Sequence, residues 1–140
     1  MNFNYAIKIE SNDSDPIEID EDQKLITGVE VLIDTIDDKV RQKASGMLAR
    51  LTIIGKIDVS IQDQLIGLFD WSKDLNGENW YRNVELKIFS GKKLYRTYEF
   101  PKMFVVDYKE FYHESGNDED GTFELYLTQK DNNFEGIKTY

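Results

Sequence analysis

The sequence predicts a mainly antiparallel β protein with one helix. Apolar and polar residues alternate with a period of two along most of the chain, a pattern typical of strands with one buried face. Several of these runs are joined by short turns, which makes consecutive strands antiparallel neighbours. A single convincing segment has the three-to-four-residue spacing of an amphipathic helix. The last four strands form a meander whose apolar face needs a second layer, and the rest of the chain is expected to supply it.

Length and charge limit the classes of protein. A chain of 140 residues predicts one domain over residues 1–140. The charge, 17 − 27 = −10, opposes binding to nucleic acid and anionic membranes. There is no cysteine, and no apolar run approaches the roughly 20 residues that a bilayer requires. The N-terminus alternates and carries charge, so no signal peptide and no membrane insertion are predicted.

Three strands are expected in the first part of the chain. They are Phe3–Glu10, Val29–Ile36 and Met47–Ile57, each with an alternating pattern. Between the first two, residues 10–22 hold seven acidic residues and no basic one. The glycine and terminal glutamate of an EF-hand loop are missing at the required offsets, so a solvated acidic surface is favoured over a calcium site.

A charged segment, Asp37–Gly46, separates the second and third strands. Its charged residues are Asp37, Asp38, Lys39, Arg41 and Lys43. The segment is too long for a hairpin turn, and long connections in compact domains are usually functional or mobile. Two interpretations stay open: an exposed surface loop, and a projecting arm that contacts a neighbouring subunit.

The helix is expected over Ile61–Leu75. Ser60 is the predicted N-cap, and Asn76–Gly77 is the predicted stop. The apolar positions that share one face are Ile61, Leu65, Leu68 and Phe69. Three aromatic residues flank the exit of the helix: Trp71, Trp80 and Tyr81. They could line a pocket for a planar ligand, but core and interface anchors are the favoured interpretation.

The meander contains four expected strands. These are Tyr81–Ser90, Lys92–Phe100, Met103–Tyr112 and Thr122–Lys130, with Phe104, Val106 and Tyr108 predicted on one face of the third. Residues 116–121 are expected to form a polar loop, and the tail from Asn133 to Tyr140 is expected to form a last short strand that closes the barrel.

The residues that usually carry catalysis are scarce. His113 is the sole histidine, and it lies at a predicted strand end where a general base would be poorly held. No glycine-rich phosphate loop is present. Asp118, Glu119 and Asp120 are consecutive, so they cannot easily converge on one metal ion. The sequence therefore predicts no enzyme, no cofactor and no metal site.

The order of elements resembles the phage tail-tube superfamily, which includes the Hcp tube proteins of type VI secretion, among them Hcp-like proteins of Gram-positive bacteria and phage-like elements. The similarity covers roughly residues 29–130. It is carried by two stretches, the strand and helix of residues 51–58 and 61–75 with Leu68-Phe-Asp-Trp71, and the meander segments 81–88, 98–100, 103–108 and 122–127.

This resemblance implies a barrel of two packed antiparallel sheets with the helix on its flank. It also implies hexameric rings that stack into the inner tube of a contractile phage tail or injection machine. Sheath or baseplate proteins would be partners, and DNA or protein cargo would pass through the lumen without specific binding. The chain would be made in the cytoplasm and then join the particle. The implied subunit-interface residues are Asp37, Asp38, Lys39, Arg41, Lys43, Trp71, Trp80 and Tyr81.

Two other functions stay open. One is a monomeric binding barrel, or a baseplate or adaptor module, with a pocket near Trp71 and Trp80. The other is a hydrolase that uses paired carboxylates, although no pair in the sequence stands out.

Overall fold

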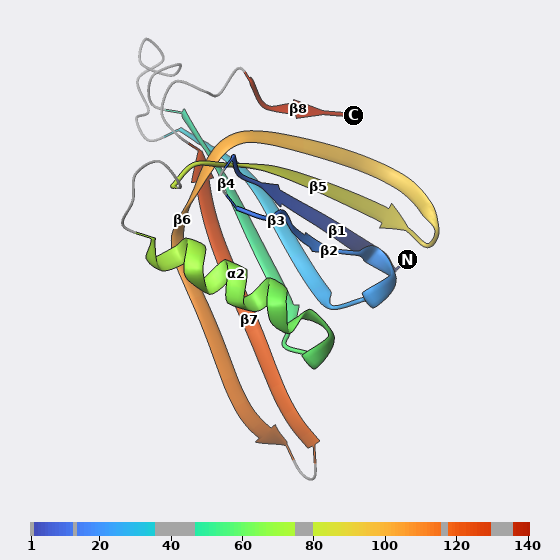
Figure 1. Cartoon of the computed structure of the whole chain (residues 1–140). Coiled ribbons are helices and arrows are strands. Elements are labelled where there is room, and N and C mark those ends of the chain that lie inside the picture. Colours follow the sequence, from blue (N-terminus) through green and yellow to red (C-terminus); the bar gives the residue numbers. More distant parts are fainter. Residues whose placement is uncertain (1, 13, 36–46, 75–79, 116–117, 130–135) are drawn as a thin grey trace.

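The computed structural model describes residues 2–12, 14–35, 47–74, 80–115, 118–129 and 136–140 (Figure 1). Strands dominate it, as the sequence predicts, and a single α-helix lies across one side of the sheet (Figure 1). In chain order the elements are β1 (Phe3–Glu10), β2 (Ile17–Ile19), η1 (Glu21–Gln23), β3 (Ile26–Thr35), β4 (Met47–Lys56), η3 (Val59–Ile61), α2 (Gln62–Lys73), β5 (Arg82–Ser90), β6 (Lys93–Ser115), β7 (Asp118–Gln129) and β8 (Lys138–Thr139).

All strand pairs are antiparallel and belong to one sheet. The order is β2-β1-β5-β6-β7-β4-β3, and β8 pairs with β6 beside this path. The expected two packed sheets are therefore two halves of one curved sheet, and the sheet does not close into a barrel among the described residues. Strand β6 belongs to both halves, because its first part pairs with β5 and its second part with β7.

The bend in β6 lies at Pro101 and Lys102. Lys102 has a φ of 53°, a left-handed conformation that a side-chain-bearing residue adopts at a cost. Its backbone N–H donates to Oδ1 of Asn83 on β5 at 3.1 Å, which holds the bend against the neighbouring strand. Two separate strands were expected here, and the structure corrects this to one continuous strand of 23 residues.

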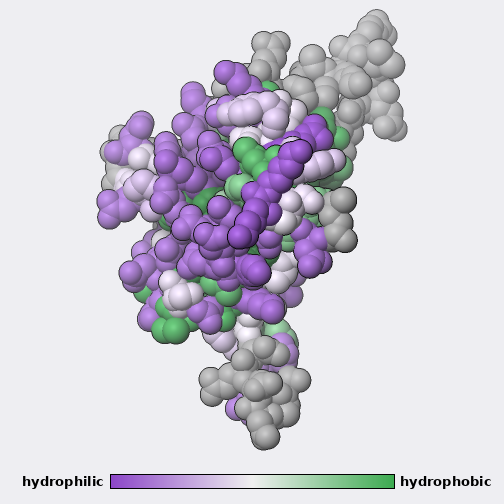
Figure 2. All heavy atoms as spheres, turned by 90° about the vertical axis from the view of Figure 1, so that its right-hand side faces the viewer, coloured by the Kyte–Doolittle hydropathy of each residue, from purple (hydrophilic) through white to green (hydrophobic). Residues whose placement is uncertain are grey.

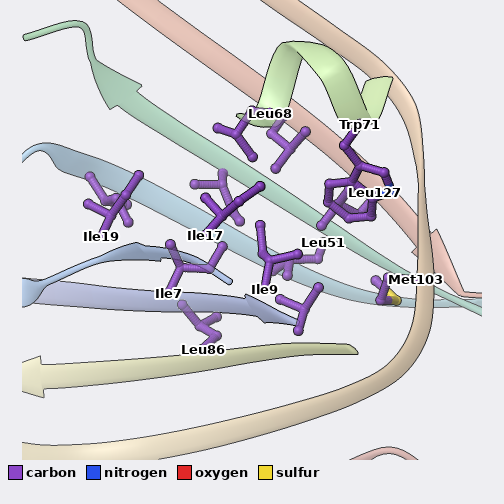
Figure 3. Close-up of a cluster of buried hydrophobic side chains, with 14 of the residues drawn as sticks. Ile7, Ile9, Ile17, Ile19, Leu51, Leu68, Trp71, Leu86, Met103 and Leu127 are labelled. Carbon is purple, nitrogen blue, oxygen red and sulfur yellow. The ribbon is translucent and has the colours of Figure 1, made fainter. Parts of the chain in front are cut away.

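The core lies between the two halves of the sheet and α2. Figure 3 shows isoleucine and leucine side chains from β1, β2, β4, β5 and β7 converging with Leu68 and Trp71 of the helix. Large side chains with almost no exposed surface include Ile9, Leu51, Leu86, Met103 and Leu127. Strands β1, β2, β4, β5 and β7 bury alternate residues, so in these strands the period of two identified in the sequence marks the core-facing positions.

The helix covers the core with a narrower face than expected. Ile61, Leu65, Leu68 and Trp71 are buried, but Phe69 is half exposed and lies outside this face. The predicted N-cap is also wrong: Asp58 caps η3 ahead of α2, and its Oδ2 accepts a hydrogen bond from the Ser60 N–H at 3.0 Å. No helix in the described ranges is long and apolar enough to cross a membrane.

Three further expectations need correction. The acidic segment 10–22 contains a strand, β2, whose Ile17 and Ile19 are buried. The expected polar loop 116–121 belongs from residue 118 onward to β7, while residues 116–117 lie outside the described ranges. A register shift between Val105 and Asp107 leaves Val106 exposed, so this residue does not share a face with Tyr108.

Candidate functional site

The charged segment that the sequence singled out cannot be placed on the structure. Asp37, Asp38, Lys39, Arg41 and Lys43 lie outside the described residues. The two strands on either side of the segment are described, and they pair in register up to Thr35 and Met47. The segment therefore leaves from, and returns to, one end of the β3–β4 pair.

The tryptophans at the helix exit join α2 to the start of β5. Trp71 is only 2% exposed, and its Nε1–H donates to the Trp80 carbonyl at 3.0 Å. The Trp80 Nε1–H donates to the Asp74 carbonyl at 2.6 Å. Tyr81 packs its ring edge-to-face against Phe104, with centroids 5.8 Å apart. These contacts fix the helix end, which accounts for both indoles without a ligand.

Arg82 completes this junction beneath Trp71. Its guanidinium carbon lies 5.1 Å from the indole centroid, which is cation–π distance. Burial lowers the pKa of Arg82, and the nearby Asp74 partly offsets the shift. The cavity at Trp71 and Trp80 has a volume of about 130 Å³, below the ~300 Å³ lower end of small-molecule sites. The junction is suited to holding the fold together.

The residues that the sequence raised as candidates for catalysis and metal binding lie on the β6–β7 hairpin. His113 is exposed, and its ring contacts Phe111 at a centroid distance of 5.1 Å. Nowhere in the described ranges do three His, Asp or Glu side chains gather as metal ligands would. The backbone of Asp118–Asp120 runs along β7 and pairs with His113–Ser115 of β6.

Two long strand edges lack a partner within the part of the chain that the structure describes. The first is β3, ten residues long, which pairs on one side with β4. The second is the β5-facing edge of β6 after Met103, where the β5 pairing stops while the β7 pairing runs on to Ser115. Long unpaired edges can hydrogen-bond to another chain, so they are the backbone sites most ready for assembly.

A groove lies between the helix and the projecting end of the β6–β7 hairpin. Figure 1 shows both strands running past the body of the molecule below α2. The groove has a volume of about 480 Å³, and its lining residues are Ile57, Asp58, Val59, Gln62, Leu65, Ile66, Phe69, Glu110 and Tyr112. The groove could not be predicted from the sequence, because Phe69 has the spacing of a core residue and its exposure is seen only in the structure.

Glu110 lines the groove on the β6 side and binds two tyrosine side chains of the same strand. Its carboxylate accepts a hydrogen bond from the Tyr108 hydroxyl at 3.0 Å and another from the Tyr112 hydroxyl at 2.7 Å. Burial, followed by the negative charge of Glu110, raises the pKa of Tyr108 well above its usual value. Both hydroxyls therefore stay protonated at neutral pH and hold the carboxylate in one orientation.

The described residues thus form a curved, open antiparallel sheet with one flanking helix and two long unpaired edges. Comparison with solved structures identifies this fold: it is the fold of the Hcp tube proteins and of components of contractile injection systems. The resemblance predicted from the sequence is confirmed at the level of the fold.

Three solved structures illustrate the match. A variant of Hcp1 from E. coli EAEC 042 has a TM-score of 0.62 and 12% identity over 98% of this chain and 97% of that chain. A chain of the anti-feeding prophage baseplate has a TM-score of 0.57 and 13% identity, covering 100% and 94%. A chain of the sheath–tube complex of the PVC extracellular contractile injection system has a TM-score of 0.57 and 14% identity, covering 98% and 88%. No family model matches the sequence, and no curated protein sequence does.

Proposed function

We propose that this protein is the structural subunit of the inner tube of a contractile phage tail or a phage-like or type VI-like injection machine. Copies assemble into a six-membered ring, and rings stack into a hollow tube. The observation that carries this proposal is the fold match over nearly the full length of both chains, with tube and tube-like proteins from several injection systems.

The unpaired edge of β3 supports assembly on physical grounds. A ten-residue edge strand exposes a row of backbone donors and acceptors, and a monomer with such an edge is prone to aggregation. The opposite end of the sheet is different, since β2 has only three residues. Two unlike edges favour head-to-tail contacts, which close into a ring when the rotation between copies allows it.

In our proposal the interface residues expected from the sequence contact a neighbouring copy. The charged segment with Asp37, Lys39 and Arg41 begins where β3 ends, and in our proposal it reaches the next subunit or ring. Trp80 is 44% exposed and Tyr81 is half-buried, so both retain ring surface for a neighbour. Trp71 contributes indirectly, because it is buried and holds Trp80 in position.

The negative net charge of the chain is compatible with a tube through which polyanions pass. A net charge of −10 repels DNA and acidic cargo from the walls, so that a polyanion slides without sticking. The partners in this proposal are sheath and baseplate proteins, and the chain moves from the cytoplasm into the particle. The role is structural, and no enzymatic step is part of it.

A charge placed next to the β3 edge tests the proposal. Leu32 is exposed on β3, so Leu32→Lys leaves the subunit folded but disfavours strand pairing between copies. We expect ring formation, measured by sedimentation velocity, to fall at least about tenfold, as for a contact that loses about 1.4 kcal/mol. The control is Asn12→Lys in the exposed β1–β2 connection, which adds the same charge and is expected to assemble normally. Equal assembly of both variants would contradict edge pairing through β3.

A baseplate or cap component is the second candidate. Chains described as parts of an anti-feeding prophage baseplate and of a tube-terminating cap have the same fold, with TM-scores of 0.57 and 0.55. Such a component would form single rings that do not stack. Negative-stain images separate the candidates, since a tube subunit gives stacked rings and an adaptor gives isolated ones.

A further inference from the structure

The turn between β5 and β6 is chemically unlike the rest of the chain. Residues 86–98 hold four basic residues and no acidic one, in a chain that has 27 acidic and 17 basic residues overall. The basic residues are Lys87, Lys92, Lys93 and Arg96. The turn is tight, because Gly91 has a φ of 63°. Its lysines are therefore presented at the outer end of a rigid hairpin.

The same end of the sheet exposes large apolar side chains. Tyr95 is 63% exposed, and Leu94 and Phe3 beside it are also exposed. The rings of Phe3 and Tyr95 lie 6.0 Å apart and are tilted against each other. Figure 2, which views the molecule from the side where this turn lies, shows a mainly hydrophilic surface with small hydrophobic patches. The hairpin end thus exposes three apolar side chains, Phe3, Leu94 and Tyr95, with basic residues around them. We call this end the knob.

The groove beside α2 has the complementary chemistry. Its two charged lining residues are carboxylates, Asp58 and Glu110. Three of its apolar residues are open to solvent, since Val59 is 82% exposed and Ile66 and Phe69 are about half exposed. Contiguous exposed apolar residues with a polar rim mark sites of protein contact.

The carboxylates of Asp58 and Glu110 can both bind a cation. Hydrogen bonds from Ser60 lower the pKa of Asp58, so it is ionised at neutral pH. A carboxylate offers about four acceptor directions, and the Tyr108 and Tyr112 hydroxyls take two of those on Glu110. A lysine ammonium can therefore bind Glu110 without displacing either tyrosine.

The knob cannot fill the groove of its own chain. Figure 1 places the β5–β6 turn at the right-hand end of the sheet, whereas α2 and the end of the β6–β7 hairpin lie to the left and below. A contact between them must join two molecules, and since the two surfaces differ it is head-to-tail. We infer that the β5–β6 hairpin end of one copy, with Leu94, Tyr95 and Lys93, docks into the groove between α2 and β6 of the next copy, opposite Asp58 and Glu110. This inference rests on the proposed ring and specifies one of its contacts.

Crosslinking tests this contact directly, because the chain has no cysteine of its own. Leu94→Cys places a thiol on the knob, and Ile66→Cys places one in the groove; both positions are exposed. The control partner is Asp70→Cys, which lies on α2 but lines a different cavity together with Asp63 and Gly67. Each variant is checked for folding by circular dichroism and for mass by light scattering before a short bis-maleimide is added.

We expect the mixture of Leu94→Cys and Ile66→Cys to form covalent dimers at least about tenfold faster than the mixture with Asp70→Cys, because docking raises the effective concentration of the two thiols. The double variant, with both cysteines in one chain, should give a ladder that ends at the size of the ring. Oligomers that show no preference for the Ile66 position would overturn this contact and leave the ring proposal standing. Monomers without crosslinks would overturn both.

Charge reversal gives an independent measurement. Lys92→Glu combined with Lys93→Glu makes the charge of the knob more negative by four units. We expect assembly to weaken by about tenfold or more at low salt. Lys24→Glu with Lys138→Glu makes the same change at exposed sites elsewhere and should assemble normally. Unchanged assembly of the knob variant would mean that the groove binds another partner, and would refute the contact between copies.

Discussion

At the scale of single residues, packing decides where this chain tolerates change. Gly55 on β4 lies against the ring of Phe123, and a Cβ at this position would sit 2.5 Å from two ring carbons and 2.9 Å from the Leu25 carbonyl oxygen. Phe123 is buried and cannot rotate away. Gly28 on β3 is the opposite case, since a Cβ there would meet no atom within 4 Å.

Substitution by alanine should change the free energy of unfolding in opposite directions at Gly55 and Gly28. Gly55→Ala should lower the free energy of unfolding by about 1–3 kcal/mol, the usual cost of overpacking a core. Gly28→Ala should leave it unchanged or raise it by up to ~1 kcal/mol, through the smaller entropy of the unfolded chain. Urea denaturation measures both values. Similar stability of the two variants would contradict the packing of Phe123 against β4.

The tyrosine pair at Glu110 predicts a dependence of stability on alkaline pH. Burial and Glu110 raise the pKa of Tyr108 in the folded state, so above a pH of about 10 the unfolded chain loses this proton while the folded chain keeps it. The unfolded state then binds fewer protons, and the free energy of unfolding falls as the pH rises. Below this range both states keep the proton and the full stability is present.

Tyr108→Phe separates this effect from others. At pH 7 the variant should be less stable by about 1 kcal/mol, because the hydrogen bond to Glu110 is lost. Above a pH of about 10 the difference should shrink, since phenylalanine has no proton to lose. Chemical denaturation at a series of pH values measures the difference in free energy of unfolding between the unsubstituted chain and Tyr108→Phe. Tyr95→Phe, at the exposed end of the sheet, is the control. A constant difference across the whole range would contradict the raised pKa.

At the scale of elements, β6 is the strand that joins the two halves of the sheet. It pairs with β5 up to Met103 and with β7 from Met103 onward. Pro101 and the left-handed Lys102 turn the strand between the two pairings. The bend is therefore what allows one sheet to wrap around the core and leave an opening for α2.

The conformation of Lys102 predicts a stabilising substitution. Lys102→Gly should raise the free energy of unfolding by about 0.5 kcal/mol, since glycine adopts a positive φ without cost but adds entropy to the unfolded chain. Asn83→Ala removes the acceptor of the Lys102 N–H and should lower it by about 1 kcal/mol. Thermal and urea unfolding check both. Destabilisation by Lys102→Gly would show that the bend does not need the left-handed conformation.

Most elements could be predicted because a half-buried strand leaves a period of two in the sequence. Ile7 and Ile9 on β1, and Leu125 and Leu127 on β7, are buried as this pattern requires. Strand β2 was missed because three residues are too short to show a period, although Ile17 and Ile19 are both buried.

The candidate site was harder to predict. The groove joins α2 to Glu110 and Tyr112, which are more than 35 positions away along the chain, and no local pattern reports such proximity. Phe69 has the spacing of a core residue, but the buried face of the helix is too narrow to cover it. The bulge at Val106 shifts the phase of the strand, and alternation alone cannot detect one inserted residue.

At the scale of the whole molecule, the described body has a buried core, while its edges and ends remain open. The core draws on every long strand and on α2 (Figure 3). The unpaired edge of β3, the groove beside α2 and the β5–β6 hairpin end lie outside it. Folding and assembly therefore depend on different residues, and substitutions can separate them.

The charged segment between β3 and β4 provides a test at this scale. We expect replacement of residues 37–46 by a four-residue Gly-Asn linker to leave the unfolding transition of the body nearly unchanged, because a shorter connection changes loop-closure entropy by less than about 1 kcal/mol. Stacking of rings should be lost, because in our proposal the segment reaches the next subunit or ring. Electron microscopy and urea denaturation of the same sample check both. A variant that still forms tubes would remove the segment from the interface.

The native mass of the purified protein, measured by light scattering with negative-stain images of the same sample, decides whether the chain assembles into rings as we propose. We expect a mass of six subunits or a multiple of six, from a subunit of 16.4 kDa, and ring-shaped particles that stack end to end. A single species of 16.4 kDa that persists at high protein concentration, with no rings in the images, would contradict it.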